Sequence, residues 1–169
     1  FVDREEYLSA LLDDPRIEGA IASLLGDDFN YTGSDGNFYV GDTAWHSDGY
    51  IDRKYPSVKM AFYLDHITRD TGALRVIPGS HRVGDPYADA IEAKLARNGP
   101  GFGVTGDQVP AQALEITPGD IGVFNHSIKH ASYGGSGHRR MFTMNFSERW
   151  PDDKLQELRD TLVKEARFW

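Results

Sequence analysis

Apolar residues at helical spacing predict helices near both ends of the chain. After Asp14-Pro15, apolar side chains recur three and four residues apart from Ile17 to Leu25, and Gly26 follows them. Because proline suits the first turn of a helix and glycine its end, this segment is predicted to be an amphipathic helix. Similar patterns predict further helices at residues 7–12, at 87–95 and after Pro151.

Between the terminal helices the spacing of apolar residues falls to two, which is typical of β-strands. From Asn37 onward, alternating segments are separated by turns such as Pro78-Gly79-Ser80. The segments predicted to be strands are 38–40, 58–64, 73–77, 113–116, 121–125 and 139–146. Neither a repeat nor a linker divides the chain, so we expect residues 1–169 to form one mainly β domain, a sandwich or barrel flanked by helices.

Composition narrows the functions that such a domain can have. The 169 residues include 18 Lys and Arg against 26 Asp and Glu, a net charge of −8, which argues against a nucleic-acid-binding surface. The chain has no cysteine, so thiolate metal sites and cysteine nucleophiles are excluded. Apolar runs fall short of the roughly 18 to 20 residues that span a bilayer, and we expect no membrane partner. A cytoplasmic location is the default expectation, and the oligomeric state stays open.

Two separate segments carry histidines that could share a metal ion. In His46-Ser47-Asp48, an extended backbone would direct the imidazole and the carboxylate to the same side. This pair is weak evidence alone, because a chain with six histidines contains such pairs by chance. His130 follows an apolar strand and supplies a second imidazole. Two histidines and one carboxylate form the triad that holds non-haem Fe(II) and leaves other coordination positions open.

A metal held in this way can be chelated by a 2-oxo acid such as 2-oxoglutarate, whose far carboxylate then needs a fixed cation. Arg139 and Arg140 open the last predicted strand. The residues that alternate with Arg140 are apolar, whereas those that alternate with Arg139 are mixed, as in the lining of a ligand cavity. We therefore predict that Arg139 is the cation. Ser132 lies two residues after His130, and its hydroxyl would point the same way and could donate to the same carboxylate.

Taken together, these residues resemble the phytanoyl-CoA dioxygenase-like family of Fe(II)/2-oxoglutarate-dependent oxygenases. The resemblance runs from about Trp45 to Phe146, more than half of the chain. The segments that carry it are Trp45–Gly49, Leu64–His66, Thr71–Leu74, Ile77–His81, Gly119–Ile121, His130–Ser132 and Arg139-Arg140.

The resemblance implies a double-stranded β-helix, or jelly roll, with flanking helices. It implies that His46, Asp48 and His130 hold iron and that Arg139, with Ser132 as a helper, binds 2-oxoglutarate. Members of the family usually have a longer N-terminal region, so we expect some N-terminal sequence to lie outside this chain. Relatives that halogenate their substrates have a small residue in place of the carboxylate of Asp48, so halogenation is disfavoured.

Residues that contact the substrate are expected near the metal ligands and on the strand that follows them. Three candidates come soon after the first two ligands: Tyr50, Arg53 and Tyr55. On the next strand, either Met60 and Phe62 or Ala61 and Tyr63 would face the cavity, and alternation alone does not decide between the two faces. Our starting expectation adds the first of these pairs, Met60 and Phe62, to the substrate site.

The sequence therefore predicts an Fe(II)- and 2-oxoglutarate-dependent oxygenase, with O2 as co-substrate. It would hydroxylate or otherwise oxidise a C–H bond of a small organic substrate while 2-oxoglutarate is decarboxylated to succinate and CO2. We predict no catalytic side chain beyond the metal ligands. Three alternatives stay open. The first is a cupin-like metalloenzyme that does not use 2-oxoglutarate, and the second is a non-enzymatic jelly-roll module that binds a small molecule. The third is a degenerate oxygenase fold that binds 2-oxoglutarate but lacks parts that further N-terminal sequence would supply.

Overall fold

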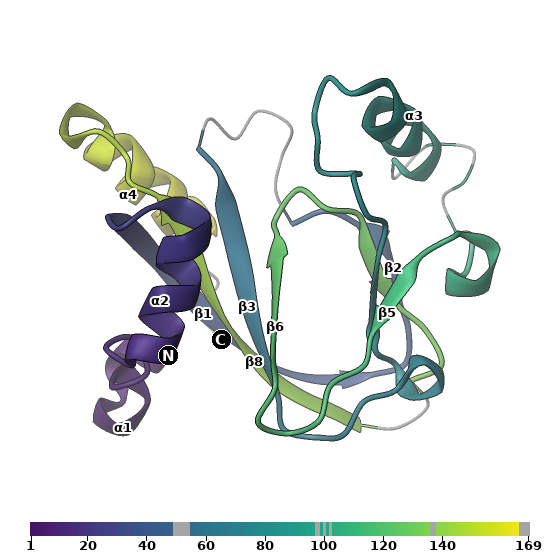
Figure 1. Ribbon diagram of the computed structural model, residues 1–169, viewed down its shortest axis with the longest axis horizontal. Coiled ribbons are helices and arrows are strands. Elements are labelled where there is room, and N and C mark those ends of the chain that lie inside the picture. Colours follow the sequence, from purple (N-terminus) through teal and green to yellow (C-terminus); the bar gives the residue numbers. More distant parts are fainter. Residues whose placement is uncertain (49–54, 97–98, 100, 102, 136–137, 166–169) are drawn as a thin grey trace.

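Two antiparallel sheets of four strands each form the body of the protein. We describe it from a computed structural model, which describes residues 1–48, 55–96, 99, 101, 103–135 and 138–165. The first sheet has the order β1-β8-β3-β6 and the second the order β2-β7-β4-β5. Figure 1 shows the strands of the first sheet on one side of the molecule and β2 and β5 on the other. This arrangement confirms the predicted jelly roll with flanking helices.

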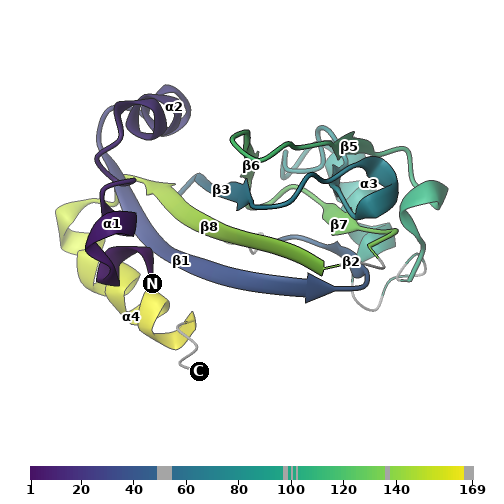
Figure 2. The same cartoon turned by 90° about the horizontal axis from the view of Figure 1, so that it is seen from below.

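The strands of the first sheet are longer than those of the second. The strands of the first sheet are β1 (Phe29–Val40), β8 (His138–Glu148), β3 (Ser57–Tyr63) and β6 (Ile121–Asn125). Those of the second are β2 (Thr43–His46), β7 (His130–Ser132), β4 (Leu74–Val76) and β5 (Gln112–Leu114). Figure 2 shows β1 and β8 running together along the length of the molecule. The short second sheet carries two of the three predicted metal ligands, so its pairing positions the site.

Helices cover the two sheets from outside. Before the first strand lie η1 (Val2–Arg4), α1 (Glu6–Ser9) and α2 (Pro15–Leu25), and between strands lie η2 (Arg69–Thr71), α3 (Pro86–Leu95) and η3 (Gly106–Gln108). The chain continues after β8 with η4 (Asp152–Lys154) and α4 (Leu155–Glu165). Figure 1 shows α2 and α4 at the opposite end of the molecule from α3. None of the described helices is both long and apolar enough to cross a membrane.

The helix predicted after Asp14-Pro15 is α2, and its ends follow the expected rules. The side chain of Asp14 accepts a hydrogen bond from the backbone N–H of Arg16, and Gly26 ends the helix with a φ of 92°. Ile17, Ile21 and Leu25 of α2 are buried against β3 and β8, in a core that also contains Met60 and Met144.

Strand β1 begins at Phe29, well before the Asn37 at which we expected strand structure to start. The extra segment is rich in residues that disfavour strands, including Gly33, Asp35 and Gly36. Pairing with β8 overrides this local preference, since β8 supplies partners along the whole of β1, with one irregularity between Tyr31 and Gly33.

The alternation in β3 places Met60 and Phe62 on the face that packs against α2. Met60 is buried in that core, and Phe62 packs against the same cluster and stacks on Phe142 at a centroid distance of 4.4 Å. Lys59 and Tyr63 point the other way, into the space between the two sheets. The assignment of Met60 and Phe62 to the substrate site is therefore wrong. Both faces of β3 are buried, so an apolar pattern could not tell them apart.

We expect Ile21→Ala in α2 to lower the free energy of unfolding by about 2–5 kcal/mol, because Ile21 is fully buried and its removal leaves a cavity. Chemical denaturation measures this loss. Leu24→Ala in the same helix is the matched control, since Leu24 is 57% exposed and its truncation should change stability by about 0.5 kcal/mol or less. Equal losses in the two variants would contradict the packing described here.

Candidate metal centre

His46, Asp48 and His130 come together between the two sheets. One ligand atom from each of the three lies within 4.8 Å of the others. The pairing of β2 with β7 sets His46 opposite His130, and their ring centroids are 4.2 Å apart. Asp48 follows β2 and completes the group, with Oδ1 3.7 Å from Nε2 of His46 and Oδ2 3.5 Å from Nε2 of His130.

Backbone carbonyls orient both imidazoles in the same way. Nδ1 of His46 lies 2.8 Å from the carbonyl oxygen of Ala44, and Nδ1 of His130 lies 2.9 Å from that of Ile128. A carbonyl oxygen can only accept a hydrogen bond, so in each ring Nδ1–H donates. In a neutral ring Nε2 is then unprotonated, and its lone pair faces the space shared with Asp48.

The charges at this centre favour the protonation states that metal binding needs. Burial lowers the pKa of His130 to about 4, although the carboxylate of Asp48 opposes the shift, so this imidazole is neutral at pH 7. Burial alone would raise the pKa of Asp48, but His130, Lys59 and His46 outweigh it and bring the pKa to about 2. Nζ of Lys59 lies 2.8 Å from Oδ2 of Asp48. Two imidazoles and one carboxylate fit Fe(II) or a similar divalent ion.

A cavity opens beside these three side chains. It is lined by Asn37, Tyr39, Thr43, His46, Asp48, Lys59, Tyr63, Leu74, Phe124, His130, Ala131, Ser132, Arg139, Met141 and Thr143. Burial raises the pKa of Tyr63 to about 12, so its hydroxyl stays protonated and can donate a hydrogen bond inside the cavity. The lining thus combines many polar groups with a few apolar side chains, which suits a small polar ligand.

Arg139 lies in the wall of this cavity and is only 3% exposed. Two of its nitrogens donate to backbone carbonyls, one to Gly72 and one to Gly41, each at 2.9 Å. Its Nε is buried and has no hydrogen-bond partner among the residues that the structure describes. A guanidinium has five N–H donors, so Arg139 is held rigidly and keeps donors for an anion. The carboxylate of a 2-oxo acid fits this requirement.

Ser132 is buried next to Arg139 and also lines the cavity. Its hydroxyl donates to the carbonyl oxygen of Gly72 at 3.1 Å. A serine has one hydroxyl proton, so the predicted donation to 2-oxoglutarate requires the hydroxyl to rotate away from Gly72. That role stays a prediction.

Arg140, which we did not predict to bind 2-oxoglutarate, points out of the cavity. Its guanidinium pairs with Asp65 at 2.6 Å, and its side chain is 56% exposed. Neighbouring strand residues point to opposite faces, so Arg139 and Arg140 cannot both line the cavity.

The structure supports little of the predicted substrate set. Tyr50 and Arg53 lie outside the described residues. Tyr55 packs against Trp150, with ring centroids 4.5 Å apart, and is not among the residues that line the cavity. In place of Met60 and Phe62, strand β3 contributes Lys59 and Tyr63. Tyr63 belonged to the alternative pair, Ala61 and Tyr63, that alternation had left open. Nothing in the sequence around Lys59 indicated that this lysine lines the cavity.

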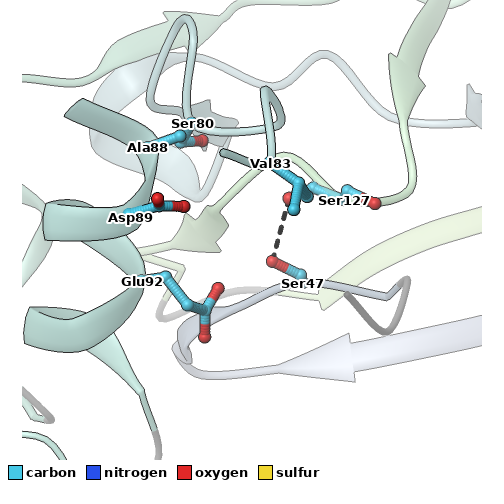
Figure 3. Close-up of a pocket in the computed structure, with 7 residues that line it drawn as sticks. All are labelled: Ser47, Ser80, Val83, Ala88, Asp89, Glu92 and Ser127. Carbon is cyan, nitrogen blue, oxygen red and sulfur yellow. Dashed lines mark hydrogen bonds between the residues drawn. The ribbon is translucent and has the colours of Figure 1, made fainter. Parts of the chain in front are cut away.

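A second, smaller pocket is lined by Ser47, the residue between the two ligands His46 and Asp48. Its lining residues are Ser47, Ser80, Val83, Ala88, Asp89, Glu92 and Ser127. Figure 3 shows Ser47 beside Ser127, opposite Asp89 and Glu92, and the hydroxyl of Ser47 donates to the backbone carbonyl of Ser127 at 3.1 Å. This hydrogen bond ties the segment that carries two ligands to the segment that precedes His130.

Comparisons with known proteins agree with this geometry. Residues 3–142 match the family described as phytanoyl-CoA dioxygenase (PhyH). A search of curated proteins finds no match.

Solved structures with the same fold include three whose descriptions are informative. EctD from S. alaskensis, in its apoform, is 23% identical with a TM-score of 0.65, and the match covers 88% of this chain and 55% of that one. HygX from Streptomyces hygroscopicus, with nickel and 2-oxoglutarate bound, is 15% identical with a TM-score of 0.68, over 89% and 68% of the two chains. EvdO2 from Micromonospora carbonacea var. aurantiaca, complexed with 2-oxoglutarate, is 23% identical with a TM-score of 0.59, over 86% and 64%. The present chain thus spans less than two thirds of the length of EctD and of EvdO2.

The metal-free protein should lose stability as the pH falls from 6.5 to about 4. His130 has a lower pKa in the folded than in the unfolded chain, so in this window the unfolded chain binds a proton that the folded chain does not. The contribution of neutral His130 to the free energy of unfolding is therefore complete above pH 6.5, and it is lost as the pH falls through about 4. Denaturant midpoints across this range measure the effect. The slope should flatten in His130→Asn but not in His66→Asn, and an unchanged slope in His130→Asn would contradict the assignment.

Gly72→Ala should weaken the binding of 2-oxoglutarate and spare metal binding. Gly72 has a φ of 98°, and an added Cβ would lie 2.8 Å from Cδ of Arg139, so the arginine must move. We expect the Kd for 2-oxoglutarate to rise about tenfold or more, which calorimetry on the nickel-loaded protein measures. Gly119→Ala is the matched control, because Gly119 has a φ of 107° but nothing lies within 4 Å of its added Cβ. Equal effects on binding would show that backbone strain, and not the displaced arginine, is responsible.

Proposed function

Because the chain belongs to the phytanoyl-CoA dioxygenase (PhyH) family, we propose that it is an Fe(II)- and 2-oxoglutarate-dependent oxygenase that oxidises a C–H bond of a small organic substrate. The observation that carries this proposal is one cavity lined by two complementary groups. One is the pair of oriented imidazoles with the carboxylate of Asp48, and the other is the buried guanidinium of Arg139.

In this proposal His46, Asp48 and His130 hold the iron, and Arg139 binds the far carboxylate of 2-oxoglutarate. Iron with 2-oxoglutarate supplies the activation of O2, so that 2-oxoglutarate, O2 and a substrate C–H bond give succinate, CO2 and a C–OH group. None of these steps requires a side chain to act as a general acid or base, so the ligands and the arginine are the essential groups.

The protein contributes orientation and shielding. The carbonyls of Ala44 and Ile128 hold the imidazoles before any metal binds, and those of Gly72 and Gly41 hold Arg139. Such preorganisation reduces the entropy lost when the metal and 2-oxoglutarate bind. The apolar side chains of Leu74, Phe124 and Met141 line the cavity and limit the access of water to the reacting groups.

The substrate is proposed to be a small molecule, because the cavity lies between two sheets and has a mixed polar and apolar lining. The net charge of −8 disfavours polyanionic substrates such as CoA esters. A cytoplasmic location stays a prediction from the sequence.

Anaerobic titration with Fe(II) tests the proposed function. We expect a visible charge-transfer band that requires both Fe(II) and 2-oxoglutarate, because only a chelated metal produces it. The band should be absent in His130→Ala. In Arg139→Ala the Kd for 2-oxoglutarate should rise about 10- to 100-fold, as expected for the loss of a charge-assisted hydrogen bond.

Arg140→Ala is the matched control, since its guanidinium pairs with Asp65 outside the cavity, and the band should form as in the native protein. A folded native protein that binds Fe(II) but develops no band with 2-oxoglutarate would indicate a cupin-like metalloenzyme of another kind. If neither Fe(II) nor 2-oxoglutarate binds, the protein is a non-enzymatic module.

A further inference from the structure

Lys59 occupies an unusual place for a lysine. It lies in the middle of β3, a central strand of its sheet, with Phe124 opposite it on β6 and Asn145 opposite it on β8. Its side chain is 17% exposed and faces the cavity, where Nζ lies 2.8 Å from Oδ2 of Asp48. Burying an ammonium group is costly unless it has a charged partner. The partner of Lys59 is the carboxylate of Asp48, which is a metal ligand in the proposed function.

A divalent metal competes with Lys59 for that carboxylate. When Asp48 shares its negative charge with a metal ion, its attraction for the ammonium group weakens, and the ammonium is repelled by the metal. Lysine is a point charge on a flexible stem with three donors, so its head can turn toward another acceptor in the cavity. Metal binding would thus convert Lys59 from the partner of Asp48 into a cation available to a ligand.

The charges that line the cavity do not balance once metal and 2-oxoglutarate are bound. Among the described lining residues, the cations are Lys59 and Arg139 and the anion is Asp48. A divalent metal cancels the two charges of 2-oxoglutarate, and Asp48 cancels one of the two cations. Within the described part of the lining, one positive charge remains. Arg139 is held at the 2-oxoglutarate end, so the remaining charge belongs to Lys59.

Among the described residues, Asp35 is a further acid near this wall, but it does not cancel that charge. Asp35 lies on the edge strand β1, is exposed to solvent and accepts hydrogen bonds from Thr143 at 3.4 Å and from Asn145 at 3.5 Å. Lys59 forms no ion pair with Asp35 in the described structure. Asn37 and Thr143 line the cavity as well and can hydrogen-bond to a polar ligand.

We propose that Lys59 binds a carboxylate of the primary substrate, so that the enzyme selects small substrates with a single negative charge. This inference rests on the function proposed above. Lys59 is then a specificity-determining residue, and its ammonium becomes available to the substrate only after the metal has taken Asp48.

The first test measures metal affinity without 2-oxoglutarate. Calorimetric titration with Ni²⁺ should show about tenfold tighter binding to Lys59→Met than to the native protein, because a competing cation has been removed. Lys59→Arg keeps the charge and should bind Ni²⁺ as the native protein does. Lys154→Met removes a lysine charge from the surface, where Lys154 pairs with Glu157, and is the matched control. Weaker Ni²⁺ binding by Lys59→Met would show that Lys59 supports the metal site and would overturn the proposal.

The second test measures the preference for a carboxylate. The nickel-loaded protein, saturated with 2-oxoglutarate, is titrated with monocarboxylic acids of three to ten carbons and with their primary amides. We expect a carboxylate to bind at least tenfold more tightly than its amide to the native protein and to Lys154→Met. The preference should fall below threefold in Lys59→Met and return in Lys59→Arg.

Two outcomes overturn the inference at this step. One is that no acid is preferred over its amide, and the other is that the preference survives in Lys59→Met. Because 2-oxoglutarate binding is measured first, a native protein that binds 2-oxoglutarate but shows no preference refutes the role of Lys59 alone. A native protein that does not bind 2-oxoglutarate refutes the proposed function and, with it, this inference.

Discussion

The pairing of β2 with β7 is the constraint on which the site depends. These are two of the shortest strands of the protein, and their register sets His46 opposite His130. Each imidazole then bonds through Nδ1 to the carbonyl two residues before it, Ala44 in one case and Ile128 in the other. The same local hydrogen bond, formed on two neighbouring strands, thus directs the Nε2 atoms of both histidines toward the same point. A shift of either strand by one residue would turn its histidine to the opposite face.

Backbone groups also fix Arg139 in the wall of the cavity. Arg139 donates to the carbonyls of Gly72 and Gly41, and Ser132 donates to the carbonyl of Gly72. Arg139 approaches Gly72 so closely that a side chain at that position would displace the arginine. The arginine is therefore held by main-chain atoms, which move less than side chains, and it keeps further donors for a ligand.

The two faces of the longer sheet have different roles, one mainly in stability and the other in binding. On its outer face, Met60 and Met144 pack against α2 in the main core. On its inner face, Lys59, Thr143 and Arg139 line the cavity. Charged and polar groups are tolerated there because each has a partner: Asp48 for Lys59, Asp35 for Thr143 and backbone carbonyls for Arg139. The cost of burying these groups is offset locally, and the outer face packs into the largest of the described hydrophobic clusters.

Local patterns alone determined much of this protein. The period of the apolar residues predicted α2 and the strand 121–125, which is β6, and alternation separated Arg139 from Arg140. These features depend on neighbours in the chain, which a sequence displays directly. Three others needed the tertiary structure. The first half of β1 is a strand only because β8 pairs with it, and β3 is buried on both faces, so its apolar pattern could not show which face meets the cavity. The pairing of Lys59 with Asp48 joins residues on separate elements, and only the folded chain brings a lone lysine to a carboxylate.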